Sequence, residues 1–197
     1  VYNRPDNRSY ELKARPDIWY NGFDGIKAGL HLNGDYMNYK HQFDLNVWMN
    51  SGLLKQISSN SFDYISYRFN YRNPLDQFVK GSSWFLSTKN QDGLLGHTIG
   101  FDKESTNEKS KIYAYFKSMY RPDSTDLNYL IYKNEWNYQA INNTVNVGLD
   151  HRYKYLKGNG DINLNMKSSS LGSDYHYAAL SLTAVNRNKL GKLHLNT

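Results

Sequence analysis

The chain of 197 residues contains no cysteine, so it holds neither a disulfide framework nor a thiolate metal site. It also has no long apolar run. Hydrophobic residues make up 39% and the mean hydropathy is −0.77, so no segment approaches the roughly 20 apolar residues of a membrane-spanning helix. The net charge of +6 is spread along the chain rather than gathered beside stacking aromatics, which argues against nucleic acid as a partner.

Motifs for known chemistry are missing as well. The six histidines are scattered, and none is followed by glutamate, so the helical His-Glu-x-x-His motif of zinc peptidases does not occur. The Gly-x-Ser-x-Gly nucleophile elbow and the Walker loop are absent too. We therefore predict no catalytic residue, metal ligand or cofactor in this chain. His31 and Asp44 can face each other from adjacent strands, and we interpret them as part of a polar network rather than as a catalytic pair.

What the sequence does have is alternation of apolar and polar residues with a period of two. It is clearest between Asn142 and Lys167, where apolar residues alternate with charged and amide residues on both sides of a glycine-rich turn at 157–160. Because successive side chains of a strand point to opposite faces, this stretch predicts a β-hairpin with one apolar and one polar face. Such a hairpin is typical of transmembrane β-barrels, which have lipid outside and water inside.

Similar alternation recurs along the chain, without any segment of helical period. It is found at about 26–36, 42–50, 64–71, 82–90, 94–102, 111–117, 175–187 and 190–197. The predicted fold is all-β, an antiparallel up-and-down transmembrane β-barrel with about ten strands present. Prolines 5 and 16 lead us to expect an irregular entry segment or linker at 1–22, followed by barrel strands and loops at 23–197. Both ends look cut, so we expect an incomplete segment of a larger barrel.

The alternation assigns side chains to two faces. We predict that the following residues face lipid: Ile26, Ala28, Leu30, Leu45, Val47, Val145, Val147, Leu149, Ile162 and Leu164. We predict that the following residues face the lumen: Lys27, His31, Asp44, Asn46, Asn146, Asp150, Arg152, Lys154 and Asn163. Trp48 also falls on the polar face, where it either packs against its neighbours or stacks on a sugar. The expected partner is outer-membrane lipid, and the long loops, including the aromatic segment around Trp136, could contact other outer-membrane proteins.

One stretch resembles a known family. The pattern Tyr-Asn-x-x-Asp-Gly-x-x-x-Gly runs from Tyr20 to Gly29 and resembles the start of the barrel in several Bacteroidota outer-membrane proteins of the surface-antigen type, within the barrel-assembly superfamily. With the strings at 31–34 and 41–44, it is similar to the C-terminal region of large Bacteroidota gluzincins, which are zinc aminopeptidase-like proteins. In those proteins a zinc peptidase domain precedes this region. The resemblance implies a parent enzyme whose active site lies outside this chain.

Three functions remain open from the sequence. The prediction is a bacterial outer-membrane β-barrel segment that serves as the membrane anchor or pore of a larger protein, one with a separate zinc peptidase domain if the resemblance holds. A second reading is a barrel that translocates or inserts other proteins. A third is a soluble β-domain that binds glycans through its 18 tyrosines and four tryptophans. Lipid exposure of the apolar face separates the first reading from the third.

Overall fold

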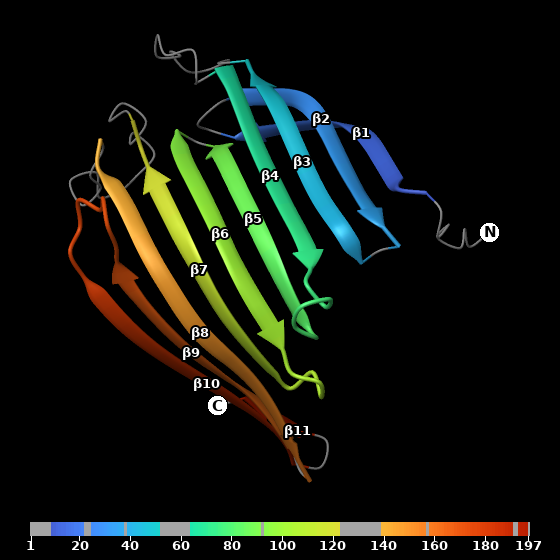
Figure 1. Cartoon of the computed structure of the whole chain (residues 1–197), viewed down its shortest axis with the longest axis vertical. Coiled ribbons are helices and arrows are strands. Elements are labelled where there is room, and N and C mark those ends of the chain that lie inside the picture. Colours follow the sequence, from blue (N-terminus) through green and yellow to red (C-terminus); the bar gives the residue numbers. More distant parts are fainter. Residues whose placement is uncertain are drawn as a thin grey trace.

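The computed structural model describes residues 9–21, 25–37, 39–51, 64–91, 93–122, 139–156, 158–190 and 193–196. These residues form one antiparallel sheet of eleven strands, arranged side by side in chain order (Figure 1). The strands are β1 (Glu11–Asn21), β2 (Gly25–Tyr36), β3 (Lys40–Asn50), β4 (Ile65–Pro74), β5 (Ser82–Gln91), β6 (Leu94–Glu104), β7 (Ser110–Tyr120), β8 (Ile141–Tyr155), β9 (Gly158–Ser169), β10 (Ala178–Leu190) and β11 (Leu193–Asn196).

The predicted all-β, antiparallel, up-and-down architecture is confirmed. Every strand from β1 to β10 has between 10 and 15 residues, whereas β11 has four. The sheet is not closed, because β1 and β11 stand at opposite ends of the strand order. No helix in the described segments is long and apolar enough to cross a membrane.

The hairpin at 142–167 forms as predicted. Its two arms are β8 and β9, and their pairing runs without a break from Thr144 opposite Ser169 to Tyr155 opposite Gly158. On the apolar face, the rings of Tyr153 and Tyr155 are stacked with their centroids 6.2 Å apart. The two rings cover Gly160 and Gly158, which have no side chain of their own to pack there.

The entry segment expected at 1–22 is wrong over most of its described length. Residues 11–21 form β1, which pairs with β2 from Glu11 opposite Asp35 to Asn21 opposite Gly25. Pro16 lies within this strand, opposite Leu30. Proline is tolerated in a strand where the N–H that it lacks has no ladder partner, and no described strand lies on the outer side of β1. The strands therefore begin at Glu11 rather than near residue 23.

The connections alternate between the two ends of the sheet. The strand ends that flank 51–64, 121–140 and 170–177 all lie at one end of the sheet, together with those that flank the shorter 22–24 and 92–93. We call this the long-connection end. The stretches 37–39, 75–81, 105–109 and 156–157 lie at the other, the short-turn end. The aromatic segment around Trp136 lies outside the described residues.

Within the described part of the chain, each strand packs mainly against its neighbours in the sheet. The ribbon accordingly shows a single twisted and curved layer (Figure 1). No second layer of described residues covers either face. The chemistry of the two faces therefore decides what the sheet can contact.

Candidate functional site

The polar face of the sheet is the candidate functional site. Residues directly opposite each other on paired strands point to the same face, so the registers assign every strand residue to one of the two faces. His31 is opposite Asn46, Lys111 is opposite Asp150, and Asp150 is opposite Asn163. All nine residues predicted to face the lumen share this polar face: Lys27, His31, Asp44, Asn46, Asn146, Asp150, Arg152, Lys154 and Asn163.

The opposite, apolar face carries all ten residues predicted to face lipid. These are Ile26, Ala28, Leu30, Leu45, Val47, Val145, Val147, Leu149, Ile162 and Leu164. Their contact with lipid remains a prediction. Other strands extend the same face, and its exposed members include Leu12, Ile18, Met49, Ile65, Ile99, Ile112, Phe116, Leu180 and Leu182. The apolar face thus runs across the whole sheet.

Burial is inverted relative to a water-soluble protein. Trp48, with 4% of its surface exposed, is the one buried hydrophobic residue among those described. The buried polar residues of the polar face are Lys27, Asn46, Asn50, Ser66, Asp102, Thr144 and Asn146. Soluble domains bury apolar side chains and rarely leave a large contiguous apolar surface exposed. Here the polar side chains crowd against one another and the aliphatic side chains face outward.

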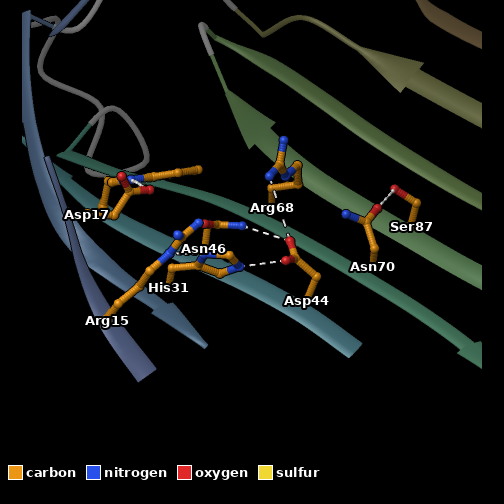
Figure 2. Close-up of polar contacts among 9 residues, drawn as sticks. Arg15, Asp17, His31, Asp44, Asn46, Arg68, Asn70 and Ser87 are labelled. Carbon is orange, nitrogen blue, oxygen red and sulfur yellow. Dashed lines mark hydrogen bonds and ion pairs between the residues drawn. The ribbon is translucent and has the colours of Figure 1, made fainter. Parts of the chain in front are cut away.

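A chain of polar contacts crosses the first four strands (Figure 2). Arg15 Nε donates a hydrogen bond to His31 Nδ1 at 2.9 Å, and His31 Nε2 lies 2.5 Å from Asp44 Oδ2. Because arginine can only donate, Nδ1 accepts, and the ring hydrogen shared with Asp44 resides on Nε2. Asn46 Nδ2 donates to Asp44 Oδ1 at 2.9 Å, and Arg68 Nη2 lies 3.7 Å from the same oxygen.

The sequence brings His31 and Asp44 together as expected, and their neighbours define what the pair can do. The Asp44 carboxylate is shared among His31, Asn46 and Arg68. Within the described residues no serine hydroxyl joins this chain of contacts, so it lacks the nucleophile that a histidine–carboxylate pair usually activates. The arrangement is that of a polar network that links β1, β2, β3 and β4.

Lys27 occupies a second cluster close to the long-connection end. Its side chain is fully buried, and Nζ donates to Ser66 Oγ at 3.1 Å. The same ammonium lies 4.8 Å from the ring centroid of Trp19 and 6.0 Å from that of Trp48. Cation–π contacts of this kind gain strength when the cation is desolvated. Trp48 also donates from Nε1 to Asp17 Oδ2 at 3.0 Å, so it packs inside the cluster and offers no free ring face to a sugar.

Two further clusters lie toward the short-turn end. Arg72 makes a two-pronged contact with Asp102, with its two terminal nitrogens 2.8 and 2.6 Å from the carboxylate oxygens, and Lys111 Nζ lies 3.4 Å away. Bidentate arginine–carboxylate contacts are the strong form of this interaction. On β7, the Tyr113 hydroxyl accepts hydrogen bonds from the amides of Asn163 and Asn165 on β9.

Sequence analysis missed several members of these clusters. Arg15, Asp17 and Trp19 were missed because β1 was expected to be irregular. The alternation at 64–71 does place Arg68 on the polar face. That position is the one sequence feature that points to its contact with the polar network. The Arg72–Asp102 pair joins β4 and β6, which are not adjacent in the sheet. Alternation cannot predict such a contact, because it depends on the registers of both strands with β5 between them.

Comparison of the chain with protein families, with curated proteins and with solved structures finds no match. In the described segments, no three histidine or acidic side chains gather as metal ligands would. The sheet therefore has one wide polar face, whose charged and amide side chains bond to one another, and one apolar face on its other side.

Proposed function

We propose that this chain forms part of the wall of a β-barrel in a bacterial outer membrane, with its apolar face toward lipid and its polar face toward the barrel interior. The observation that carries the proposal is the inverted burial. Aliphatic residues are exposed across the whole apolar face, whereas the polar face is bonded to itself. In a bilayer that exposure is favourable, because alternate residues of each strand meet hydrocarbon and the others meet the interior.

Strand length supports the proposal. A strand tilted by about 45° needs roughly 9–11 residues to cross the hydrocarbon layer. The strands from β1 to β10 have between 10 and 15 residues, so each is long enough.

Aromatic residues of the apolar face gather near the short-turn end. Three pairs are in ring contact there: Tyr10 with Phe43, Tyr71 with Trp84, and Tyr153 with Tyr155. At the other end of the sheet, Tyr20 and Tyr120 stand at or next to the last residue of their strands. Aromatic girdles at both membrane interfaces are a feature of transmembrane barrels, because the rings are apolar while their polar groups can reach water.

The role of such a wall is to anchor a larger protein, or to enclose a pore within it. The resemblance to the region that follows a zinc peptidase domain in Bacteroidota gluzincins supports the anchoring role, and it places any peptidase chemistry outside this chain. A soluble glycan-binding domain fits less well. Such a domain would need a further layer to cover the apolar face, and Trp48 on the polar face is buried.

The test is the behaviour of the full-length protein in its own cell envelope. We expect it to sediment with the outer membrane, to stay there through an alkaline carbonate wash, and to be released only by detergent. Once released, it should remain monodisperse only while detergent is present. Release by carbonate as a protein that stays monodisperse without detergent would contradict the proposal.

A further inference from the structure

The polar face carries a group of lysines near one end of the sheet. Lys27 lies two residues after β2 begins at Gly25, and Lys89 lies two residues before β5 ends at Gln91. Lys117 and Lys167 lie three and two residues before the ends of β7 and β9. All four strand ends belong to the long-connection end of the sheet. The lysines therefore lie two or three residues inside that end, although the sequence separates them by many residues. The registers step Lys89, Lys117 and Lys167 along the strands by two residues from each to the next.

The carboxylates of the polar face are placed differently. Those on the strands from β2 to β9 lie in the other half of their strands: Asp35, Asp44, Asp102, Glu104, Asp150 and Asp161. There they pair with neighbouring cations, as Asp102 does with Arg72 and Asp161 does with Arg187. From β2 to β9 the carboxylates of the polar face are thus confined to the short-turn half, while these four lysines lie in the other half.

Three of the lysines lack an acidic neighbour. Lys27 is held by Trp19 and Ser66, but for Lys89, Lys117 and Lys167 no carboxylate of a described residue lies within ion-pair distance. Lys117 is instead close enough to Lys89 and Lys167 for their charges to repel its own. Such a concentration of like charge is unfavourable unless an anion compensates it.

The local packing leaves room for Lys89 and Lys117 on the polar face, while Lys167 Nζ lies 5.4 Å from the ring centroid of Tyr177. The methylenes of Lys89 lie across Gly96 on β6, the strand between β5 and β7, with the nearest carbon 3.2 Å from where a Cβ would stand. Any larger residue at position 96 would obstruct that path. Lys117 lies opposite Thr98 and Thr144, whose short side chains leave it room.

The spacing indicates the kind of anion. Neighbouring strands are about 4.8 Å apart and each residue advances about 3.3 Å along a strand. Successive lysines are two strands and two residues apart, so their backbones are about 12 Å apart. A lysine ammonium is a compact point charge on a flexible four-carbon stem, and it commonly binds phosphate. Two such groups on alternate strands match an anion with two or more phosphoryl groups better than a single small anion.

We propose that Lys89, Lys117 and Lys167 form a binding site on the polar face for an anion that carries at least two linked phosphoryl groups. The site itself depends only on the placement of the three lysines. Its place in a barrel interior, on the path of a solute, rests on the proposed function.

Binding is measured on the detergent-solubilised full-length protein by titration calorimetry, with inorganic pyrophosphate as the probe and orthophosphate for comparison. Removing one charge-assisted contact by Lys117→Gln should weaken pyrophosphate binding about tenfold or more. Lys117→Arg should retain most of the affinity, because it keeps the charge. Orthophosphate should bind more weakly than pyrophosphate.

The matched control is Lys154→Gln, which removes the same charge from the same face near the short-turn end. It should bind pyrophosphate as the unmodified protein does. Equal affinities for the unmodified protein and Lys117→Gln would overturn the proposal, as would equal losses in Lys117→Gln and Lys154→Gln.

A second measurement separates this proposal from the proposed function. In planar bilayers, a conducting barrel should be blocked by pyrophosphate from one side, and Lys117→Gln should raise the blocking concentration about tenfold. If the protein dissolves without detergent and binds pyrophosphate through these lysines, the binding site is supported and the membrane proposal fails. If the protein inserts into membranes but does not bind pyrophosphate, the membrane proposal is supported and the binding site is overturned.

Discussion

At the scale of single residues, Leu182 and Thr183 on β10 provide a matched test of the two faces. Both are exposed, Leu182 on the apolar face opposite Leu164 and Thr183 on the polar face opposite Asn163. Exposure to water would make arginine nearly neutral at both sites, within about 0.5 kcal/mol. We expect Leu182→Arg to destabilise the barrel by roughly 2–4 kcal/mol, because it places a charge in hydrocarbon.

Thr183→Arg is the control, since it introduces the same side chain one residue away on the polar face. It should change the free energy of unfolding little. The measurement is chemical unfolding of the full-length protein in lipid vesicles. Similar small costs at both positions would show that the apolar face meets water, and the lipid-facing assignment would be abandoned.

Gly148 tests how closely the polar face is packed. A Cβ at this position would lie 2.3 Å from Cζ of Tyr113, whose hydroxyl accepts a hydrogen bond from Asn165 at 3.1 Å. Gly148→Ala must therefore displace the ring and its hydrogen bonds, and overpacking of this kind costs typically 1–3 kcal/mol. Gly96→Ala should cost less in the same unfolding assay, because its nearest neighbours are flexible methylenes of Lys89. A larger loss at Gly96 would contradict this account.

At the scale of strands, alternation predicted most of the sheet because side-chain period depends on the backbone alone. It assigned residues of β2, β3, β8 and β9 to two faces, and the registers keep each set together. It failed for β1, where Pro16 was taken as a break. Whether a proline is tolerated depends on whether the strand lies at an edge, and that is a property of the finished sheet.

The charge clusters were harder to predict than the strands. Alternation gives the face of a residue but not its depth, which depends on the register of every strand between two positions. Lys89 and Lys167 are four strands apart, and the pairings between them, which offset the two lysines by four residues along the strand direction, could not be derived from alternation. The proximity of His31 and Asp44 depends on the register of a single hairpin, so it could be predicted from the sequence.

The two ends of the sheet should lie on opposite sides of the membrane. Bacterial barrels have short periplasmic turns and longer extracellular loops. Leu171 lies in the connection 170–177 and Phe78 in the connection 75–81, with exposed fractions of 96% and 82%. The chain has no native cysteine, so a cysteine placed at either position is the only labelling site within it. A membrane-impermeant maleimide should label Leu171→Cys on intact cells.

Phe78→Cys should react with the same reagent only after the outer membrane is permeabilised. Labelling of denatured protein checks that both thiols are reactive. If intact cells label Phe78→Cys and spare Leu171→Cys, the orientation is reversed. Equal labelling of both positions on intact cells would mean that the strands do not cross the membrane.

At the scale of the whole molecule, the open sheet sets a condition on the proposed function. Each free edge presents a row of unpaired backbone groups, and in hydrocarbon each unsatisfied group costs several kcal/mol. β1 and the far side of β10 are such edges over most of their length, since β11 pairs only with Arg187–Leu190. A wall that crosses lipid must therefore be closed by further strands, from the same polypeptide or from other copies.

Closure gives the last prediction. A closed barrel has no edge at which unfolding can begin, so we expect the full-length protein to resist sodium dodecyl sulfate at room temperature and to migrate as a compact band that shifts on boiling. Glu11, Lys13 and Arg15 lie on the polar face of β1, and Leu12 and Ile18 on its apolar face. Deleting residues 11–21 would remove this strand and leave β2 as the new edge. The heat-dependent shift should then be lost, because the strand that closes the barrel against β1 no longer has a partner with the matching register. A shift that survives the deletion would show that β1 takes no part in closing the barrel.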